Sequence, residues 1–288
     1  MYIRDFTFDK YKELCRAIKN SGYKTYSMKD FFINSAKQDL EKENFIIMRH
    51  DIDNKIDHPF ALEMAKFEKS IGIFSTYYFR TVPNVFNEEV INEISEMGHE
   101  IGYHYEALNE SKGDYSKALD IFKFNLKKMR EIYPVMTIAQ HGGSLGDLTA
   151  TTFFDFIKTG FFLLLKRNKI KCYESKAIWG KYSFKDLGIL GEAYLSLDFN
   201  KIIYFSDTGI RWDAFDNRVL DCINTPYYSS KGKLIRTTDD LIGKIERKEI
   251  NQMCILTHPP NWRDPLFSWL KWQFLQKFRN FGKSIFLK

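Results

Sequence analysis

Residues 45–70 read FIIMRHDIDNKIDHPFALEMAKFEKS, a short apolar run followed closely by the pattern of an amphipathic helix. Phe45–Arg49 has the composition of a strand that is covered on both faces. A helix is predicted over His58–Ser70, with Asp57 as its N-cap and Pro59 at the first helical position. A strand followed directly by a helix is the repeating unit of a parallel α/β fold.

The same alternation of apolar runs and helical patterns continues along the chain. Further strands are predicted at Ile73–Phe79, Glu100–His104, Met136–Ala139, Ile189–Ser196, Lys201–Ser206 and Cys254–Thr257. Further helices are predicted at Asn87–Met97, Asp114–Tyr133, Thr238–Arg247 and Asp264–Phe281. This alternation favours a parallel sheet, open or closed into a barrel, and seven strands fit a barrel with one unit fewer than the common eight.

The chain has no internal repeat and no linker rich in Pro, Gly or Ser. We therefore predict a single α/β domain over residues 1–288, with its core at 44–260. Residues 147–188 fit the alternation poorly and are predicted to form a long basic insertion between strands four and five. The C-terminal helix, 264–281, is predicted to close the barrel with its aromatic side chains.

The net charge of +6 is distributed unevenly. Residues 151–185 have a balance of +6 and residues 261–288 one of +5, which leaves −5 on the other 225 residues. The first basic segment is suited to an anionic substrate such as a phosphate-linked sugar. The second is also rich in aromatics, so contact with an anionic membrane surface is an alternative to barrel closure. No recognised nucleic-acid-binding motif accompanies the charge, and we expect no nucleic-acid partner.

Cysteine usage and the N-terminal residues predict the compartment. The four cysteines form no CxxC pair, which is typical of a reducing environment. The first residues lack the apolar region of a secretory signal, and the most apolar run, Phe153–Leu165, is too short to span a bilayer. We predict a cytoplasmic protein, located at the inner face of the membrane if residues 261–288 bind lipid.

Polar side chains gather where the predicted strands end. Asp51 and Asp53 follow strand one, and because side chains alternate they point the same way, with Arg49 behind them. His104 and Glu106 share a face after strand three for the same reason. Two adjacent carboxylates repel unless a cation lies between them or one is protonated. A divalent metal, with zinc the best match to mixed oxygen and nitrogen ligands, removes that repulsion and leaves the second carboxylate as a base.

Aspartate or histidine also marks the ends of strands four, six and seven, at His141, Asp207 and His258. Active sites of parallel α/β folds are built at the carboxyl ends of the strands, so we predict that these residues face one site. Asp207, Arg211 and Trp212 are predicted to bind a sugar, with the indole stacked on its apolar face. An ordinary turn at the strand end is the alternative interpretation of these three residues.

Three motifs resemble the successive motifs of the polysaccharide deacetylase (NodB-homology) superfamily. They are Arg49-His50-Asp51-Ile52-Asp53, Gly98-His99-Glu100-Ile101-Gly102-Tyr103-His104 and Leu256-Thr257-His258. The resemblance spans roughly residues 44–260. A closer similarity, to a branch found in bacterial surface-polysaccharide loci, is carried by Gly191–Leu195 (GEAYL), Asp207–Gly209 with Arg211-Trp212, and Thr257–Pro259.

The resemblance implies a distorted (β/α)7 barrel and metal-dependent removal of an N- or O-acyl group from a sugar of a surface-polysaccharide precursor. Position by position, Asp51 matches the general base and Asp53 the metal-binding carboxylate. His104 matches the first metal histidine, and His258 matches the histidine that protonates the leaving group. The implied metal polarises the acyl carbonyl and acidifies its water, from which Asp51 takes a proton.

The chain departs from the family pattern in its metal ligands. Where the family places a second metal histidine, four residues after the first, this chain has Leu108. Glu106, which is nearer and on the correct face, is the first candidate to replace it. His141 from strand four is the alternative ligand and otherwise a substrate contact. The loss at Leu108 also supports a second hypothesis, a barrel that binds sugar or a partner enzyme without hydrolysis.

The arginine-containing third motif of the family is missing as well. Residues 139–142 read AQHG in its place. Arg49 and Arg80 are therefore candidates for the charge that orients the base, and both are predicted to contact the substrate.

Overall fold

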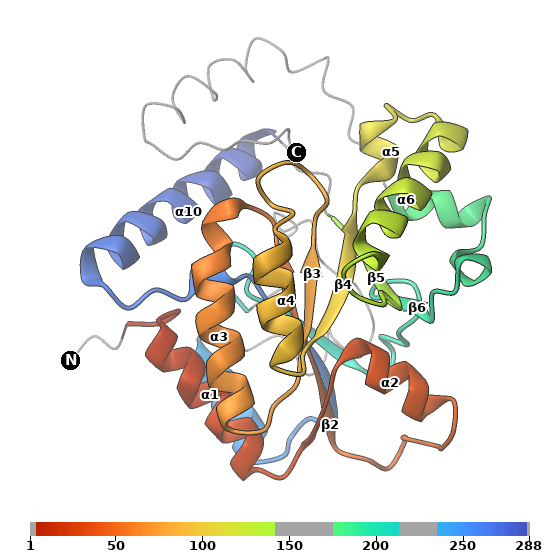
Figure 1. The fold of residues 1–288 in the computed structure, drawn as a ribbon. Helices are drawn as coiled ribbons and strands as arrows, with labels where there is room; N and C mark the ends of the chain where they lie inside the picture. Colours follow the sequence, from red (N-terminus) through yellow and green to blue (C-terminus); the bar gives the residue numbers. More distant parts are fainter. Residues whose placement is uncertain (1–3, 142–174, 213–234, 287–288) are drawn as a thin grey trace.

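The computed structural model describes residues 4–141, 175–212 and 235–286, which build one curled sheet of parallel strands in the form of a half-barrel (Figure 1). The strands lie in the order β6-β5-β4-β3-β2-β8-β7, and β1 pairs with the first residues of β2. They are β1 Lys24–Tyr26, β2 Phe45–Ile52, β3 Thr76–Phe79, β4 Glu100–Tyr105, β5 Thr137–Gln140, β6 Gly191–Glu192, β7 Ile203–Ser206 and β8 Gln252–Thr257. The seven predicted strands are thus present, and β1 is an additional strand.

Helices connect most of the strands. They are α1 Phe8–Asn20, α2 Met28–Ser35, α3 His58–Ser70, α4 Glu88–Glu96, α5 Ala107–Glu110, α6 Tyr115–Arg130, α9 Thr238–Glu246 and α10 Leu266–Phe286. Short 3-10 helices are η1 Lys55–Asp57, η2 Ser175–Gly180, η3 Phe184–Leu187 and η4 Pro259–Asn261. The five predicted helices correspond to α3, α4, α6, α9 and α10, with the predicted bounds for α3 and ends displaced by at most five residues in the others.

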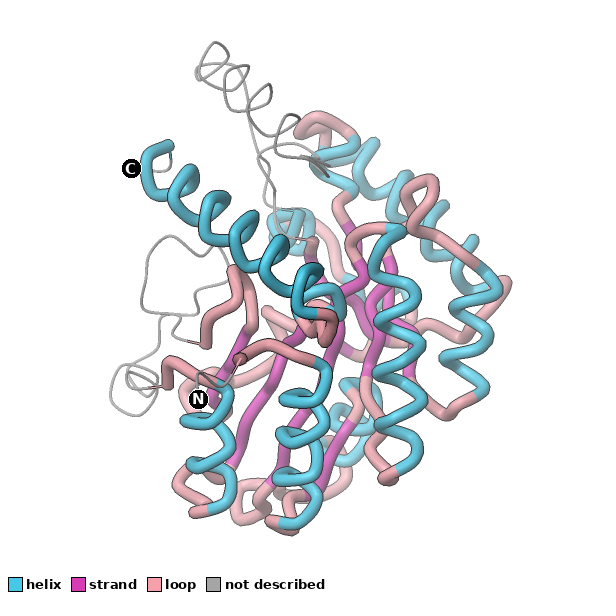
Figure 2. The backbone as a smooth tube through the Cα atoms, turned by 90° about the vertical axis from the view of Figure 1, so that its left-hand side faces the viewer, coloured by secondary structure: helices cyan, strands magenta, loops and turns pink. Residues whose placement is uncertain are grey.

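The central strand, β2, separates the two sides of the sheet, and all of its residues are buried. Met48 packs with α1 and α9 on the outer side, where α1, α3, α4 and α6 lie side by side (Figures 1 and 2). Ile47 packs on the inner side, against residues of β3 and β8. Because side chains alternate along a strand, Asp51 continues the inner row and His50 the outer one.

The register of the sheet brings several strand ends to one edge. His50 of β2 pairs with Thr257 of β8, so Asp51 and His258 follow at the same level. On the other side of β2, the ends of β3, β4 and β5 reach the same edge, where β4 contributes His104. This carboxyl edge is where the predicted site residues lie.

Strand β6 is much shorter than predicted, Gly191–Glu192 instead of Ile189–Ser196. The reason is the buried carboxylate of Glu192, which accepts hydrogen bonds from the backbone N–H groups of Tyr194 and Leu195, both at 2.7 Å. These bonds turn the chain out of the sheet directly after the second residue of the strand.

Residues 147–174 of the predicted basic insertion lie outside the described residues, and its described part, 175–188, contains η2 and η3. None of the helices in the described ranges combines the length and the apolar character that crossing a membrane requires.

Candidate metal centre

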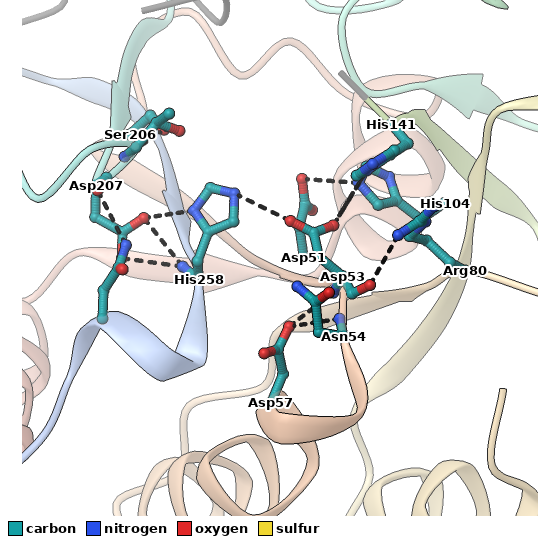
Figure 3. Close-up of polar contacts among 12 residues, drawn as sticks. Asp51, Asp53, Asn54, Asp57, Arg80, His104, His141, Ser206, Asp207 and His258 are labelled. Atoms are coloured by element: carbon teal, nitrogen blue, oxygen red, sulfur yellow. Dashed lines mark hydrogen bonds and ion pairs between the residues drawn. The ribbon is translucent and has the colours of Figure 1, made fainter. Parts of the chain in front are cut away.

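Three side chains converge at the carboxyl edge of the sheet: Asp53 after β2, His104 in β4 and His141 after β5 (Figure 3). Asp53 Oδ1 lies 3.3 Å from His104 Nε2 and 3.2 Å from His141 Nδ1. The two ring nitrogens are 3.2 Å apart. Both histidines are buried, and the group offers one oxygen and two nitrogens that could hold a metal ion.

The spacing of these atoms fits a tetrahedral metal site. With metal–ligand bonds of about 2.0–2.1 Å, neighbouring ligand atoms of a tetrahedron are about 3.3–3.4 Å apart. Asp53 Oδ1 is moreover a buried acceptor that makes no hydrogen bond within the described residues, although two imidazole nitrogens lie next to it. Ligand atoms that face one another without a hydrogen bond to the oxygen are arranged as they would be around a cation.

The orientation of His104 and the ionisation of Asp53 also suit a metal. His104 Nδ1 is 3.0 Å from the carbonyl oxygen of Ala139. Because a carbonyl can only accept, Nδ1 carries a proton, and Nε2 is the ring nitrogen that faces the site. Burial by itself raises the pKa of Asp53, but His141 and His104 outweigh burial and hold the pKa well below its usual range. Asp53 is therefore ionised, the form in which a carboxylate binds a divalent metal.

Glu106, the first candidate for the additional ligand, is not part of this group. Strand β4 ends at Tyr105, and Glu106 has φ −139° and ψ 24°, so the alternation of faces stops there. Its Oε1 instead accepts hydrogen bonds from Arg80 Nε and Nη2, at 2.9 and 2.5 Å. The group that could hold a metal contains His141, the alternative ligand, in place of Glu106. Leu108 is buried in the apolar core.

Asp51 lies beside the three metal-ligating candidates and is held by Arg49. Arg49 Nη2 donates to both carboxylate oxygens of Asp51, at 3.0 and 2.7 Å, and to the hydroxyl oxygen of Tyr194 at 3.1 Å. Burial by itself raises the pKa of Asp51, but Arg49 outweighs burial and, with His104, lowers the pKa below its usual value. Asp51 Oδ2 is 3.5 Å from His104 Nε2. This oxygen is therefore an ionised acceptor next to the candidate metal position.

His258 lies on the opposite side of the two aspartates from His104 and His141 (Figure 3). Its Nδ1 donates to Asp207 Oδ1 at 2.6 Å, and its Nε2 is 4.0 Å from Asp53 Oδ2. Burial by itself lowers the pKa of His258, but Asp207 outweighs burial and raises the pKa to about 10. His258 is therefore a cationic proton donor at neutral pH.

Asp207, which was predicted to bind a sugar, supports His258 instead. It is fully buried, and its carboxylate accepts hydrogen bonds from the His258 backbone N–H at 3.0 Å and from Trp262 Nε1 at 2.9 Å. These contacts fix the ring of His258 with Nε2 directed to the site.

The other residues predicted to bind substrate are mostly enclosed. Trp212 is fully buried, packs against the rings of Phe6 and Trp262, and donates from Nε1 to Thr238 Oγ1 at 3.0 Å. An indole enclosed in this way has no face for a sugar, which corrects that prediction. The guanidinium groups of Arg49 and Arg80 are also buried, and each forms an ion pair with a carboxylate. Arg211 is half-buried, and its contact with a sugar stays a prediction.

The sequence patterns missed the part that Asp57 plays. Its carboxylate does not cap α3 as predicted but accepts hydrogen bonds from the backbone N–H groups of Asp53 and Asn54, at 2.8 and 2.9 Å. These bonds fix the loop that carries Asp53. Burial, together with the charge of Asp53, raises the pKa of Asp57 to about 7. The sequence shows that Asp57 follows Asp53 by four residues. It does not show that the carboxylate of Asp57 accepts hydrogen bonds from the preceding loop and not from the helix that follows.

Comparison with known proteins gives no relative: no family model matches the chain, and neither a curated protein nor a solved structure matches it.

Proposed function

We propose that this protein is a metal-dependent deacetylase that removes an N- or O-acyl group from a sugar of a surface-polysaccharide precursor, and that its fold is the distorted (β/α) barrel of the NodB-homology superfamily. The observation that carries the proposal is the triangle of Asp53, His104 and His141, flanked by an ionised Asp51 and a protonated His258. The motif resemblance supports the family, and the parallel half-barrel is compatible with it.

The residues divide the chemistry of acyl hydrolysis among themselves. A divalent metal, for which zinc is the best match to these ligands, supplies Lewis acidity that polarises a carbonyl and acidifies water. Asp51 accepts a proton from the attacking water, because Arg49 keeps its carboxylate ionised and directed to the site. His258 donates a proton to the leaving amine or alcohol, because Asp207 keeps it charged. A base and an acid on opposite sides of one metal position suit hydrolysis better than simple binding.

Two substitutions, one at His141 and one at Glu106, test which of these residues is a metal ligand. We expect His141→Ala to lower zinc affinity by more than about 100-fold, since a ligand contributes more than the outer-shell partners whose loss costs 10–100-fold. Glu106→Gln, the matched control, should retain stoichiometric zinc because Glu106 binds Arg80. Zinc content is measured by mass spectrometry after equilibration in a zinc buffer, and activity as acetate released from an N-acetylglucosamine oligomer and from O-acetylated sugars.

The opposite pattern, with zinc lost from Glu106→Gln and retained by His141→Ala, would show that the ligand assignment is wrong. If the wild-type chain takes up no divalent metal, the proposed mechanism is wrong. Stoichiometric zinc without acetate release from any acylated sugar would favour the second hypothesis, a sugar-binding barrel that does not hydrolyse. That hypothesis was based on Leu108, and the position of His141 weakens its basis.

Asp207→Asn should change the pH dependence of the reaction. A raised pKa keeps His258 protonated up to about pH 10, and the proton is lost as the pH rises through that value. Without the charge of Asp207 the pKa falls towards the ordinary value of about 6.5, so the alkaline limb of kcat/KM moves to lower pH by two or more units. The measurement is a kcat/KM profile of both proteins from pH 6 to about pH 10. An unchanged alkaline limb would exclude His258 as the acid.

A further inference from the structure

The C-terminal helix α10 has two apolar faces, and its side-chain hydrogen bonds with the other described residues come from one of them. On the inner face, Trp269 Nε1 donates to the carbonyl oxygen of Asp5 at 2.7 Å, and Trp272 Nε1 donates to Asn261 Oδ1 at 2.9 Å. Leu275, one turn further along this face, is 7% exposed. These contacts attach the first half of α10 to the N-terminal segment and to η4, so the predicted role in closing the barrel accounts for this face alone.

The opposite face of α10 carries large apolar side chains in solvent. Phe267 is 86% exposed, Leu266 50% and Leu270 47%. Residues three and four apart lie on the same side of a helix, so Phe267, Leu270 and Lys271 form one surface, half a turn away from Trp269 and Trp272. Figure 2 shows α10 running obliquely across the outside of the molecule to the C-terminus. We call Leu266, Phe267, Leu270, Lys271 and Lys277 the outer face of α10.

The charge of α10 is all of one sign. The sequence of Leu266–Phe286 contains four basic residues and no acidic one, and Lys271 and Lys277 are exposed beside the apolar side chains. An exposed apolar surface edged by lysines is complementary to the interface of an anionic lipid bilayer, where apolar side chains enter the acyl boundary and lysines meet the headgroups. A second copy of this chain is a poor occupant, because an identical face would bring lysines against lysines.

We propose that the outer face of α10 binds the surface of an anionic membrane, with the helix lying in the interfacial plane. α10 does not qualify as a helix that crosses a membrane, which agrees with binding along the surface. It begins eight residues after His258, so a bound α10 holds the carboxyl edge of the sheet within about 30 Å of the lipid. The proposal is independent of the chemistry proposed above and survives if that chemistry is wrong.

The test is co-sedimentation of the full chain with two kinds of vesicle, phosphatidylcholine alone and phosphatidylcholine mixed with phosphatidylglycerol. We expect binding to the anionic vesicles, weakened by salt, and little binding to the neutral ones. Phe267→Glu combined with Leu270→Glu should lower the partition coefficient at least tenfold. Lys271→Gln combined with Lys277→Gln should lower it by roughly fivefold for each charge removed.

Matched controls lie on α6, where Phe124 is 69% exposed and Lys123 and Lys127 are exposed. Phe124→Glu, and Lys123→Gln with Lys127→Gln, should leave vesicle binding within twofold of wild type. A wild-type chain that stays in the supernatant with anionic vesicles overturns the proposal, as does equal binding of the outer-face and the α6 variants. Sedimentation velocity without lipid tests whether a second copy of the chain binds the outer face instead. A dimer that Phe267→Glu converts to a monomer would identify the outer face as a contact between copies and overturn the proposal.

Discussion

Asp51→Asn lowers kcat for acyl hydrolysis by on the order of 10³-fold while the protein keeps its zinc. The carboxylate of Asp51 is ionised, lies 3.5 Å from His104 Nε2 and is not one of the three converging ligands. An amide in its place fills the same volume but cannot accept the proton of the attacking water, and loss of a general base typically costs 10²–10⁴-fold. Zinc content, kcat and thermal unfolding are measured on the same preparation.

The matched control is the same chemical change two residues further on. Asp53→Asn should lose both zinc and activity, because Asp53 supplies the oxygen of the triangle. The two variants thus separate a base from a ligand. A tenth or more of wild-type kcat in Asp51→Asn would show that another group accepts the proton, and loss of zinc from that variant would show that Asp51 is itself a ligand.

The side of the sheet on which Asp51 and Asp53 lie could be predicted because it depends on local geometry. A buried strand fixes the alternation of its side chains, and the strand ends carry the polar residues whatever their neighbours do. The choice between Glu106 and His141 depended on a dihedral angle that no local pattern specifies. Glu106 shares the face of His104 only if β4 continues, and β4 ends at Tyr105. His141 lies next to His104 because β5 pairs with β4. The pairing of these strands is a property of the tertiary structure, which no local sequence pattern specifies.

Two further differences have different causes. Helix α1 was not predicted although its signals are local: Thr7 caps it through a hydrogen bond from Lys10 N at 3.1 Å, and Tyr11 and Leu14 recur at helical spacing. The alternation of charged and aromatic residues obscured that period. Trp212, by contrast, follows a strand end as a sugar-binding indole would, and only the packing of Phe6, Trp262 and α9 around it makes it a core residue. No feature near Trp212 in the sequence distinguishes the two cases.

A buried cluster around Glu68 of α3 determines much of the acid stability that we expect. Glu68 is fully buried on the outer side of the sheet, where Oε1 accepts hydrogen bonds from Tyr11 and His50 and Oε2 accepts from Ser75 and Tyr77. Burial by itself raises the pKa of Glu68, but His50 outweighs burial and lowers the pKa from 4.5 to about 2. One carboxylate therefore joins α1 and α3 to β2 and β3, and its charge stabilises the folded state.

Glu68→Gln should lower the free energy of unfolding by about 3 kcal/mol at neutral pH, the value that corresponds to this change in pKa. A lowered pKa stabilises the fold above the unfolded value of about 4.5, and this stabilisation is lost as the pH falls towards about 2. The difference between wild type and Glu68→Gln is therefore constant above about pH 5 and narrows below it, as measured by urea unfolding at several pH values. Glu63→Gln, on the exposed side of the same helix, should change stability by less than about 0.5 kcal/mol. A difference that persists unchanged at about pH 3 would mean that packing around the amide, and not the charge of Glu68, is responsible.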